Sequence, residues 1–228
     1  MPDQSNTHLV TFQNRTLRIR PARLKPNRLV VLIHGLTGDE NSMWVFARNF
    51  AEDYWIVAPR APYSAEHVDG GYSWWPRQAE SSESQEESQG TPSAENLRPF
   101  ADALIKLIDK YAAENNIVAN PCDILGFSQG GVMVYALALL YPERIRRAAI
   151  LASFIPANAE VLLQKSLIKN KPFFIAHGTL DDKVKIDTAR RSVDILKKAG
   201  ADVIFCEDEV GHKVSAHCLR ALEEFFAN

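Results

Sequence analysis

The chain has 228 residues, of which 46% are hydrophobic and 24% are charged, and its formal net charge is −2. This length fits one large domain, and the composition is ordinary for a globular protein in water. The charge excludes a strongly basic surface of the kind that binds nucleic acid or anionic membranes. The longest uninterrupted apolar run, residues 132–141, is too short to span a bilayer.

The first ten residues, MPDQSNTHLV, are polar and lack the apolar core of a secretory signal. Three cysteines, Cys122, Cys206 and Cys218, form an odd set without metal-type spacing, so we expect buried, reduced thiols. These features together predict a cytoplasmic protein.

Short apolar runs alternate with helical patterns along the chain, which predicts an α/β fold. Residues 8–22 read as two strands joined by a turn at residues 13–15 and would form an antiparallel N-terminal edge. The other strands should form a mostly parallel central sheet with helices on both faces, in a single domain over residues 1–228. The further strands are expected at residues 28–34, 55–59, 122–127, 147–152, 172–177 and 203–206. The helices are expected from Thr91-Pro92 past residue 111 and at residues 129–140, 187–199 and 214–226.

An acidic segment interrupts this alternation at residues 78–95, which contain five Glu, five Ser and three Gln but no Lys or Arg. The segment is too polar to bury, so it predicts a flexible, solvated loop. A loop of this length is either a functional lid or a tolerated insertion, and both remain open.

Ser128 stands in the stretch GFSQGG, between a predicted strand and a predicted helix. Glycines at positions 126 and 130 remove the side chains that would collide where the strand and the helix approach. Ser128 would therefore project at the carboxyl edge of the sheet, where open α/β sheets bind ligands. A serine hydroxyl needs a base and an orienting carboxylate to become nucleophilic, so the chain must supply both.

His212 is the expected base, because it lies between the last predicted strand and the last predicted helix. A carboxylate should follow the strand at residues 172–177, where HGTLDD offers Asp181, which we choose, and Asp182, the alternative. Ser128, Asp181 and His212 then occur in the chain order of the α/β-hydrolase fold. Structural, packing or surface roles are expected for His8, His34, His67, His177 and His217.

Backbone donors for a developing oxyanion are also expected near Ser128. The N–H of Gln129 is the first candidate, because this residue directly follows the serine at the predicted helix start. A turn in IHGLTGDE, residues 33–40, leaves the strand at residues 28–34 and offers the N–H of Leu36 as the second candidate.

The stretches HGLTGDE, APRAP, GFSQGG, HGTLDD and the GH at residues 211–212 resemble the landmarks of the phospholipase/carboxylesterase family of α/β-hydrolases. That family includes small bacterial carboxylesterases, lysophospholipases and acyl-protein thioesterases, and the likeness extends from about residue 28 to residue 225. The resemblance implies a catalytic triad of Ser128, Asp181 and His212 and oxyanion-hole positions at Leu36 and Gln129.

Three aromatic residues, Tyr72, Trp74 and Trp75, stand in GYSWWP just before the acidic segment. They are candidates for the wall of an apolar acyl groove. Anchoring of the acidic segment against the body of the protein explains them equally well.

We therefore predict a serine carboxylesterase that needs no cofactor and no metal and forms an acyl-enzyme on Ser128. The same machinery would serve a lysophospholipase or an acyl-protein thioesterase; a peptidase or perhydrolase is less favoured. Two other classes stay open: a non-catalytic binding protein on this fold, and a metal hydrolase using His177, Asp181 and His212. The expected partner is a small-molecule acyl ester, with no nucleic acid and no stable membrane insertion, and the sequence is compatible with a homodimer.

Overall fold

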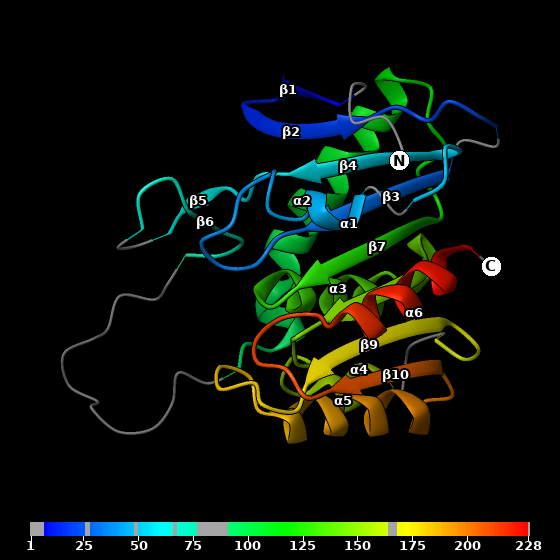
Figure 1. Cartoon of the computed structure of the whole chain (residues 1–228). Coiled ribbons are helices and arrows are strands. Elements are labelled where there is room, and N and C mark those ends of the chain that lie inside the picture. The colour runs from blue at the N-terminus through cyan, green and yellow to red at the C-terminus, as the bar shows by residue number, and fades with distance from the viewer. Residues whose placement is uncertain are drawn as a thin grey trace.

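A computed structural model describes residues 7–25, 28–47, 50–65, 68–76, 91–163 and 168–227. Within these residues, the central element is an eight-stranded sheet with the order β1-β2-β4-β3-β7-β8-β9-β10 (Figure 1). β2 pairs antiparallel with β1 and β4, and the remaining neighbours are parallel. A small second sheet pairs β5 with β6. The strands are β1 (His8–Phe12), β2 (Arg15–Arg20), β3 (Arg28–Ile33), β4 (Tyr54–Pro59), β5 (Tyr63–Ser64), β6 (Tyr72–Ser73), β7 (Cys122–Phe127), β8 (Ile145–Leu151), β9 (Pro172–Gly178) and β10 (Asp202–Asp208).

Successive side chains of a strand point to opposite faces of the sheet, and on the inner strands most of them are apolar. Both faces are therefore covered by helices. One apolar cluster joins the sheet to α2, α3, α4 and α5, and a second cluster joins it to α1 and α6. α3 is buried along nearly its whole length at the centre of the first cluster. The helices are α1 (Trp44–Ala47), α2 (Ala94–Glu114), α3 (Gln129–Leu140), α4 (Ala159–Leu163), α5 (Ile186–Lys198) and α6 (Ala216–Ala227), with a 3-10 turn at Pro142–Arg144.

The predicted fold class is confirmed, including the antiparallel N-terminal edge formed by β1 and β2. Gln13 and Asn14 form the turn between these strands with φ values of 49° and 60°. Two successive left-handed residues match the right-handed twist of a hairpin, which explains the short connection. β7 and α3 have the bounds that their apolar runs predict.

The predicted acidic loop is wrong at its C-terminal end. Ser93 forms an isolated bridge with Ala157, and α2 begins at Ala94, so Ala94 and Glu95 are helical. The helix starts here because the Oγ of Ser93 accepts a hydrogen bond from the N–H of Asn96 at 3.1 Å, which satisfies an end group of the helix. Residues 77–90 of the predicted loop lie outside the described residues.

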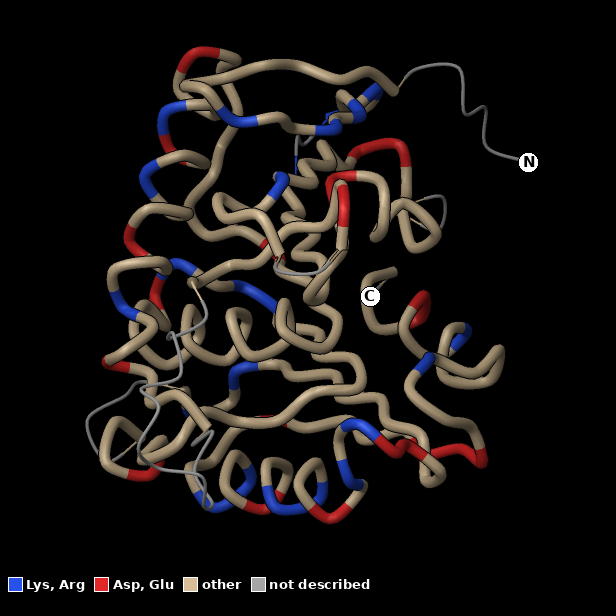
Figure 2. Tube along the Cα trace, turned by 90° about the vertical axis from the view of Figure 1, so that its left-hand side faces the viewer, with Lys and Arg blue, Asp and Glu red and all other residues tan. Residues whose placement is uncertain are grey.

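The parallel strands end at one edge of the sheet, toward the left in Figure 1 and toward the viewer in Figure 2. The candidate site residues lie in the loops that follow four of these strands, β3, β7, β9 and β10. Figure 2 shows Lys and Arg interspersed with Asp and Glu around the outside of the described chain.

The prediction of three reduced thiols is wrong for two of them, because Cys206 and Cys218 form a disulfide. α6 packs against β10 and brings its first turn beside the strand, a long-range contact that the spacing of the two cysteines does not reveal. Cys122 is free and buried, and desolvation raises the pKa of its thiol to about 12.

Candidate active site

Ser128 lies on a sharp turn between β7 and α3, with φ 52° and ψ −118°. Its N–H donates to the carbonyl of Leu151 on β8 at 2.9 Å, and its side chain does not cap the helix. Two glycines make the turn possible: a Cβ on Gly126 would lie 2.3 Å from the carbonyl oxygen of Gly130. A Cβ on Gly130 would lie 2.1 Å from the carbonyl oxygen of Ile33. This turn holds a strained serine with its hydroxyl free for chemistry.

The ring of His212 links Ser128 to Asp181. Its Nε2 lies 3.0 Å from the Oγ of Ser128, and its Nδ1 lies 2.7 Å from Oδ2 of Asp181. Since the carboxylate can only accept, this network assigns the ring proton to Nδ1 and leaves Nε2 free to accept the serine proton. The ring also packs on Phe127, with the ring centroids 5.0 Å apart.

Asp181 is 3% exposed and is held by backbone groups of its own loop. Its Oδ1 accepts hydrogen bonds from the N–H groups of Lys183 and Val184, both at 2.9 Å. Burial by itself raises the pKa of this carboxyl, but the bonds from Val184, His212 and Lys183 outweigh burial and lower the pKa overall. Asp182, the alternative from sequence, is exposed.

Two other histidines are buried and act as parts of the scaffold. Nε2 of His177 donates to the carbonyl of Val184 at 2.7 Å and lies 3.4 Å from Oδ2 of Asp181. In His34, Nδ1 donates to the carbonyl of Gly35 at 2.7 Å, and Nε2 accepts from the N–H of Ala61 at 3.0 Å. Burial lowers the pKa of His34, which keeps its ring neutral.

Two further histidines lie on the surface of the described chain. His8 is exposed on the edge strand β1, and His217 is exposed in the first turn of α6. His67 lies outside the described residues.

Both candidate oxyanion donors flank the serine turn. Gln129 is the first residue of α3, so its N–H has no acceptor within the helix. Leu36 lies in a turn closed by a 3.1 Å hydrogen bond from the N–H of Gly38 to the carbonyl of Gly35. A Cβ on Gly35 would lie 3.4 Å from the Cβ of Ser128, which shows how closely this turn approaches the serine.

Residues 72–75, the aromatic segment, form hydrogen bonds that hold the turn containing Leu36. The sequence did not reveal this role. Trp74 is 3% exposed, and its indole N–H donates to the carbonyl of His34 at 2.7 Å. The side-chain carbonyl of Gln129 accepts a hydrogen bond from the backbone N–H of Trp74 at 3.1 Å, and its amide nitrogen donates to Oγ of Ser73 at 2.9 Å. These bonds join the serine helix, the aromatic segment and the strand that precedes the Leu36 turn.

Tyr72 and Trp75 are both half-buried. The N–H of Thr37 donates to the carbonyl of Tyr72 at 3.0 Å, and the guanidinium of Arg60 stacks on the Tyr72 ring, 4.6 Å from its centroid. Trp75 packs against the larger apolar cluster. These contacts anchor the segment, and a part in substrate binding stays a prediction for all three aromatic residues.

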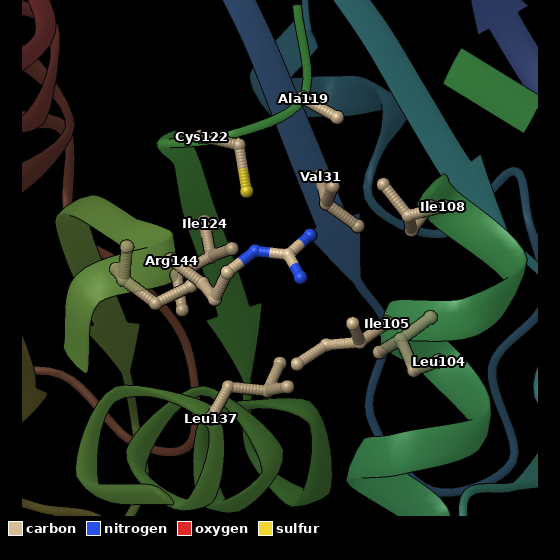
Figure 3. A pocket seen from close by; sticks show the side chains of 10 residues that line it. Val31, Leu104, Ile105, Ile108, Ala119, Cys122, Ile124, Leu137 and Arg144 are labelled. Atoms are coloured by element: carbon tan, nitrogen blue, oxygen red, sulfur yellow. The ribbon is translucent and has the colours of Figure 1, made fainter. Parts of the chain in front are cut away.

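A small cavity of about 20 Å³ lies at the opposite end of β7, under α2 (Figure 3). Figure 3 shows the guanidinium of Arg144 pointing into it from one side and Cys122 from another. The volume is about that needed for one water molecule, so the cavity cannot hold an acyl substrate. The carboxyl edge around Ser128 is the better candidate site.

The fold and the chain order of these residues define the class of protein. A mostly parallel sheet with a serine on a strand-to-helix turn, followed by an aspartate and a histidine after later strands, is the arrangement of an α/β-hydrolase. Among the described residues, no helix combines the length and the apolar character that crossing a membrane requires.

Within this class, the chain belongs to the phospholipase/carboxylesterase family, whose model matches residues 14–228. A probable carboxylesterase of Oryza sativa subsp. japonica is 29% identical over 216 residues, which cover 89% of this chain and 78% of that protein. Acyl-protein thioesterase 1 of Cryptococcus neoformans is 28% identical over 176 residues, covering 73% and 71%. The carboxylesterase of Bacillus cereus shares the fold with a TM-score of 0.76 at 18% identity, covering 98% of this chain and 95% of its own.

These relationships make the protein a hydrolase of the serine α/β-hydrolase type with an esterase or thioesterase function.

Proposed function

We propose that the protein is a carboxylesterase that hydrolyses carboxylic esters through an acyl-enzyme on Ser128. The continuous hydrogen-bonded chain from Ser128 through His212 to Asp181 carries this proposal. The 3.0 Å between Oγ of Ser128 and Nε2 of His212 suits proton transfer from serine to histidine, and the 2.7 Å bond to Asp181 orients the ring. No cofactor is required, since the serine supplies the nucleophile and the histidine moves the proton.

In the acylation step, Oγ of Ser128 attacks the ester carbonyl carbon while Nε2 of His212 takes the serine proton. The buried Asp181 carboxylate stabilises the imidazolium that forms. The carbonyl oxygen becomes an oxyanion, which the N–H groups of Leu36 and Gln129 would stabilise. His212 then protonates the leaving alcohol, and later removes a proton from the water that hydrolyses the acyl-enzyme.

Apolar side chains at the edge of the site favour an acyl substrate. Leu36, next to the serine turn, is 51% exposed, and Leu180, next to Asp181, is 60% exposed. Exposed leucines at a reaction site gain free energy when an acyl chain covers them.

Thioester hydrolysis is the second candidate, favoured by the relatives that are named acyl-protein thioesterases. The attack by Ser128 and the proton transfers by His212 do not depend on whether the leaving atom is oxygen or sulfur, so the same steps would release a thiol. A pair of substrates with the same acyl group on oxygen or on sulfur separates the two candidates through the ratio of their kcat/KM values.

Labelling with a fluorophosphonate probe tests the nucleophile. Wild-type protein should be labelled at one site, Ser128→Ala should not be labelled, and Ser42→Ala, which changes an exposed serine, should be labelled like the wild type. A folded wild type that resists the probe would overturn the esterase proposal. Labelling of Ser128→Ala would overturn the choice of nucleophile.

A further inference from the structure

The disulfide between Cys206 and Cys218 encloses the loop that carries His212. Cys206 belongs to β10 and Cys218 to the first turn of α6. His212 stands six residues from each cysteine, at the middle of their twelve-residue separation. The covalent bond therefore fixes both ends of the histidine loop to each other.

Non-covalent contacts hold this loop near its two ends and at His212 itself, whose ring bonds to Asp181 and Ser128. On the β10 side, the carbonyl of Val210 accepts from the N–H of Leu180 at 3.0 Å and lies against Gly178, where a Cβ would come within 2.1 Å. On the α6 side, Oγ of Ser215 accepts from the N–H of Cys218 at 3.1 Å. Beside His212, the carbonyl oxygen of Gly211 also lies against Gly178, where a Cβ would come within 2.3 Å, while the other side of Gly211 is open, with the nearest atom 3.9 Å from an added Cβ.

We propose that the Cys206–Cys218 bond is a positioning element for His212, and that its reduction by a dithiol lowers turnover; this rests on the proposed esterase function. Opening the bond lets the two ends of the loop separate and increases the number of conformations that residues 209–215 can adopt. Ser128 and Asp181 are held by other contacts and keep their places. The change therefore lowers kcat and leaves KM nearly constant.

The two cysteines of the disulfide differ in exposure and in their distance from the start of α6. Both residues are buried, but Cys206 at 7% is more exposed than Cys218 at 2%, so we take the sulfur of Cys206 as the one attacked. Cys218 is then the leaving thiolate, and the amino end of α6 favours a negative charge there. The exposed His217 places its Nδ1 3.7 Å from Sγ of Cys206.

The exchange balances as a two-electron reduction. A thiolate of the dithiol attacks Sγ of Cys206, the Cys206–Cys218 bond breaks, and a mixed disulfide forms. The second thiol of the reductant then displaces Cys206 and closes its own disulfide. Both cysteines end as thiols, and the dithiol has lost two electrons and two protons.

The test compares oxidised protein with protein reduced by dithiothreitol, in the presence of EDTA so that no metal binds the freed thiols. Reduction is verified by alkylation and mass spectrometry. We expect kcat for a short acyl ester to fall about 10-fold, since small displacements of a catalytic group have effects of this size or larger. Reoxidation should restore kcat.

Two variants make the result specific. The double variant Cys206→Ala/Cys218→Ala should show the low kcat with or without dithiothreitol. Cys122→Ala removes the buried thiol at the far end of β7 and should respond to dithiothreitol like the wild type. Verified reduction with no change in kcat would overturn the proposal.

Amide hydrogen exchange tests the loop independently of any ester turnover. We expect reduction to speed exchange in residues 209–215 about 10-fold while the buried helix α3 keeps its protection. Equal exchange before and after reduction would overturn the positioning role even if the protein hydrolyses no ester. Equal loss of protection in α3 would also overturn it, because the bond would then stabilise the whole fold.

Discussion

Ser128 and His212, whose side chains lie 3.0 Å apart, are held by different kinds of structure. Ser128 is fixed by main chain: a strand and a buried helix meet at it, Gly126 allows the two to approach each other, and Gly130 allows the neighbouring strand β3 to approach the helix. His212 lies in a loop held by the Asp181 carboxylate, by a few hydrogen bonds near its ends and by a disulfide.

Because of this difference, mutations in the two regions of the site should have different effects. A substitution that adds a side chain at the glycines of the serine turn disturbs the packing of the sheet and should lower the free energy of unfolding. A substitution in the loop that carries His212 leaves the core intact and should mainly lower kcat. The predictions below test this separation.

The largest effect is expected at the carboxylate that orients His212. Asp181→Asn should lower kcat about 10⁴-fold, because an amide N–H facing Nδ1 favours the wrong ring tautomer. The matched control, Asp182→Asn, changes the adjacent exposed residue and should stay within about 2-fold of the wild type, as surface substitutions usually do. Steady-state kinetics on purified variants would reject the role of Asp181 if its variant kept a tenth of wild-type kcat.

A pair of glycine variants compares the two regions directly. Gly130→Ala should cost about 3–5 kcal/mol of unfolding free energy or prevent folding, because its Cβ would meet the Ile33 carbonyl oxygen at 2.1 Å. Gly211→Ala, in the histidine loop, should stay within about 0.5 kcal/mol, since the nearest atom is 3.9 Å from its Cβ. Urea unfolding measures both, and equal losses would remove the distinction between the regions.

Acid should weaken the site through Asp181. Its folded pKa lies below the unfolded value, so the carboxylate contributes stability that is present above about pH 3.9, the ordinary pKa of aspartate, and is lost as the pH falls through the folded pKa. Unfolding free energies measured from pH 6 down to pH 2 should therefore fall more steeply for the wild type than for Asp181→Asn. Parallel curves would show that the lowered pKa does not contribute to stability.

The smallest effect is expected at the hydrogen bond that pins the Leu36 turn. Trp74→Phe removes the indole N–H that donates to the carbonyl of His34, and one such bond is worth about 0.5–1.5 kcal/mol. If that energy holds the oxyanion turn, kcat should fall about 2- to 10-fold. Trp75→Phe, a change at the adjacent half-buried residue, serves as the control and should leave kcat near the wild-type value.

Much of the fold could be predicted because its signals are local. The apolar run at residues 122–127 and the helical run after Ser128 define β7 and α3 to the residue. Parallel strands end at a common edge, so strand order in the sequence also indicated which loops would meet. The structure accordingly brings Ser128, Asp181 and His212 together from three separate loops.

The features that the sequence did not reveal depend on contacts between distant segments. The Cys206–Cys218 bond needs α6 to lie beside β10, and nothing local distinguishes these cysteines from reduced core thiols. The bond from Trp74 to the His34 carbonyl likewise joins segments forty residues apart. The choice between Asp181 and Asp182 is made by two backbone N–H groups of their own loop, whose direction depends on the turn that the loop adopts.

The state of the three cysteines gives the protein a practical property for labelling. Cys206 and Cys218 are bonded to each other, and Cys122 is buried with a thiol pKa of about 12, so the oxidised chain presents no reactive thiol among its three cysteines. The variant Leu180→Cys would introduce a single thiol open to maleimide at an exposed position beside Asp181. A fluorophore attached there would report directly on the arrival of an acyl chain at the site.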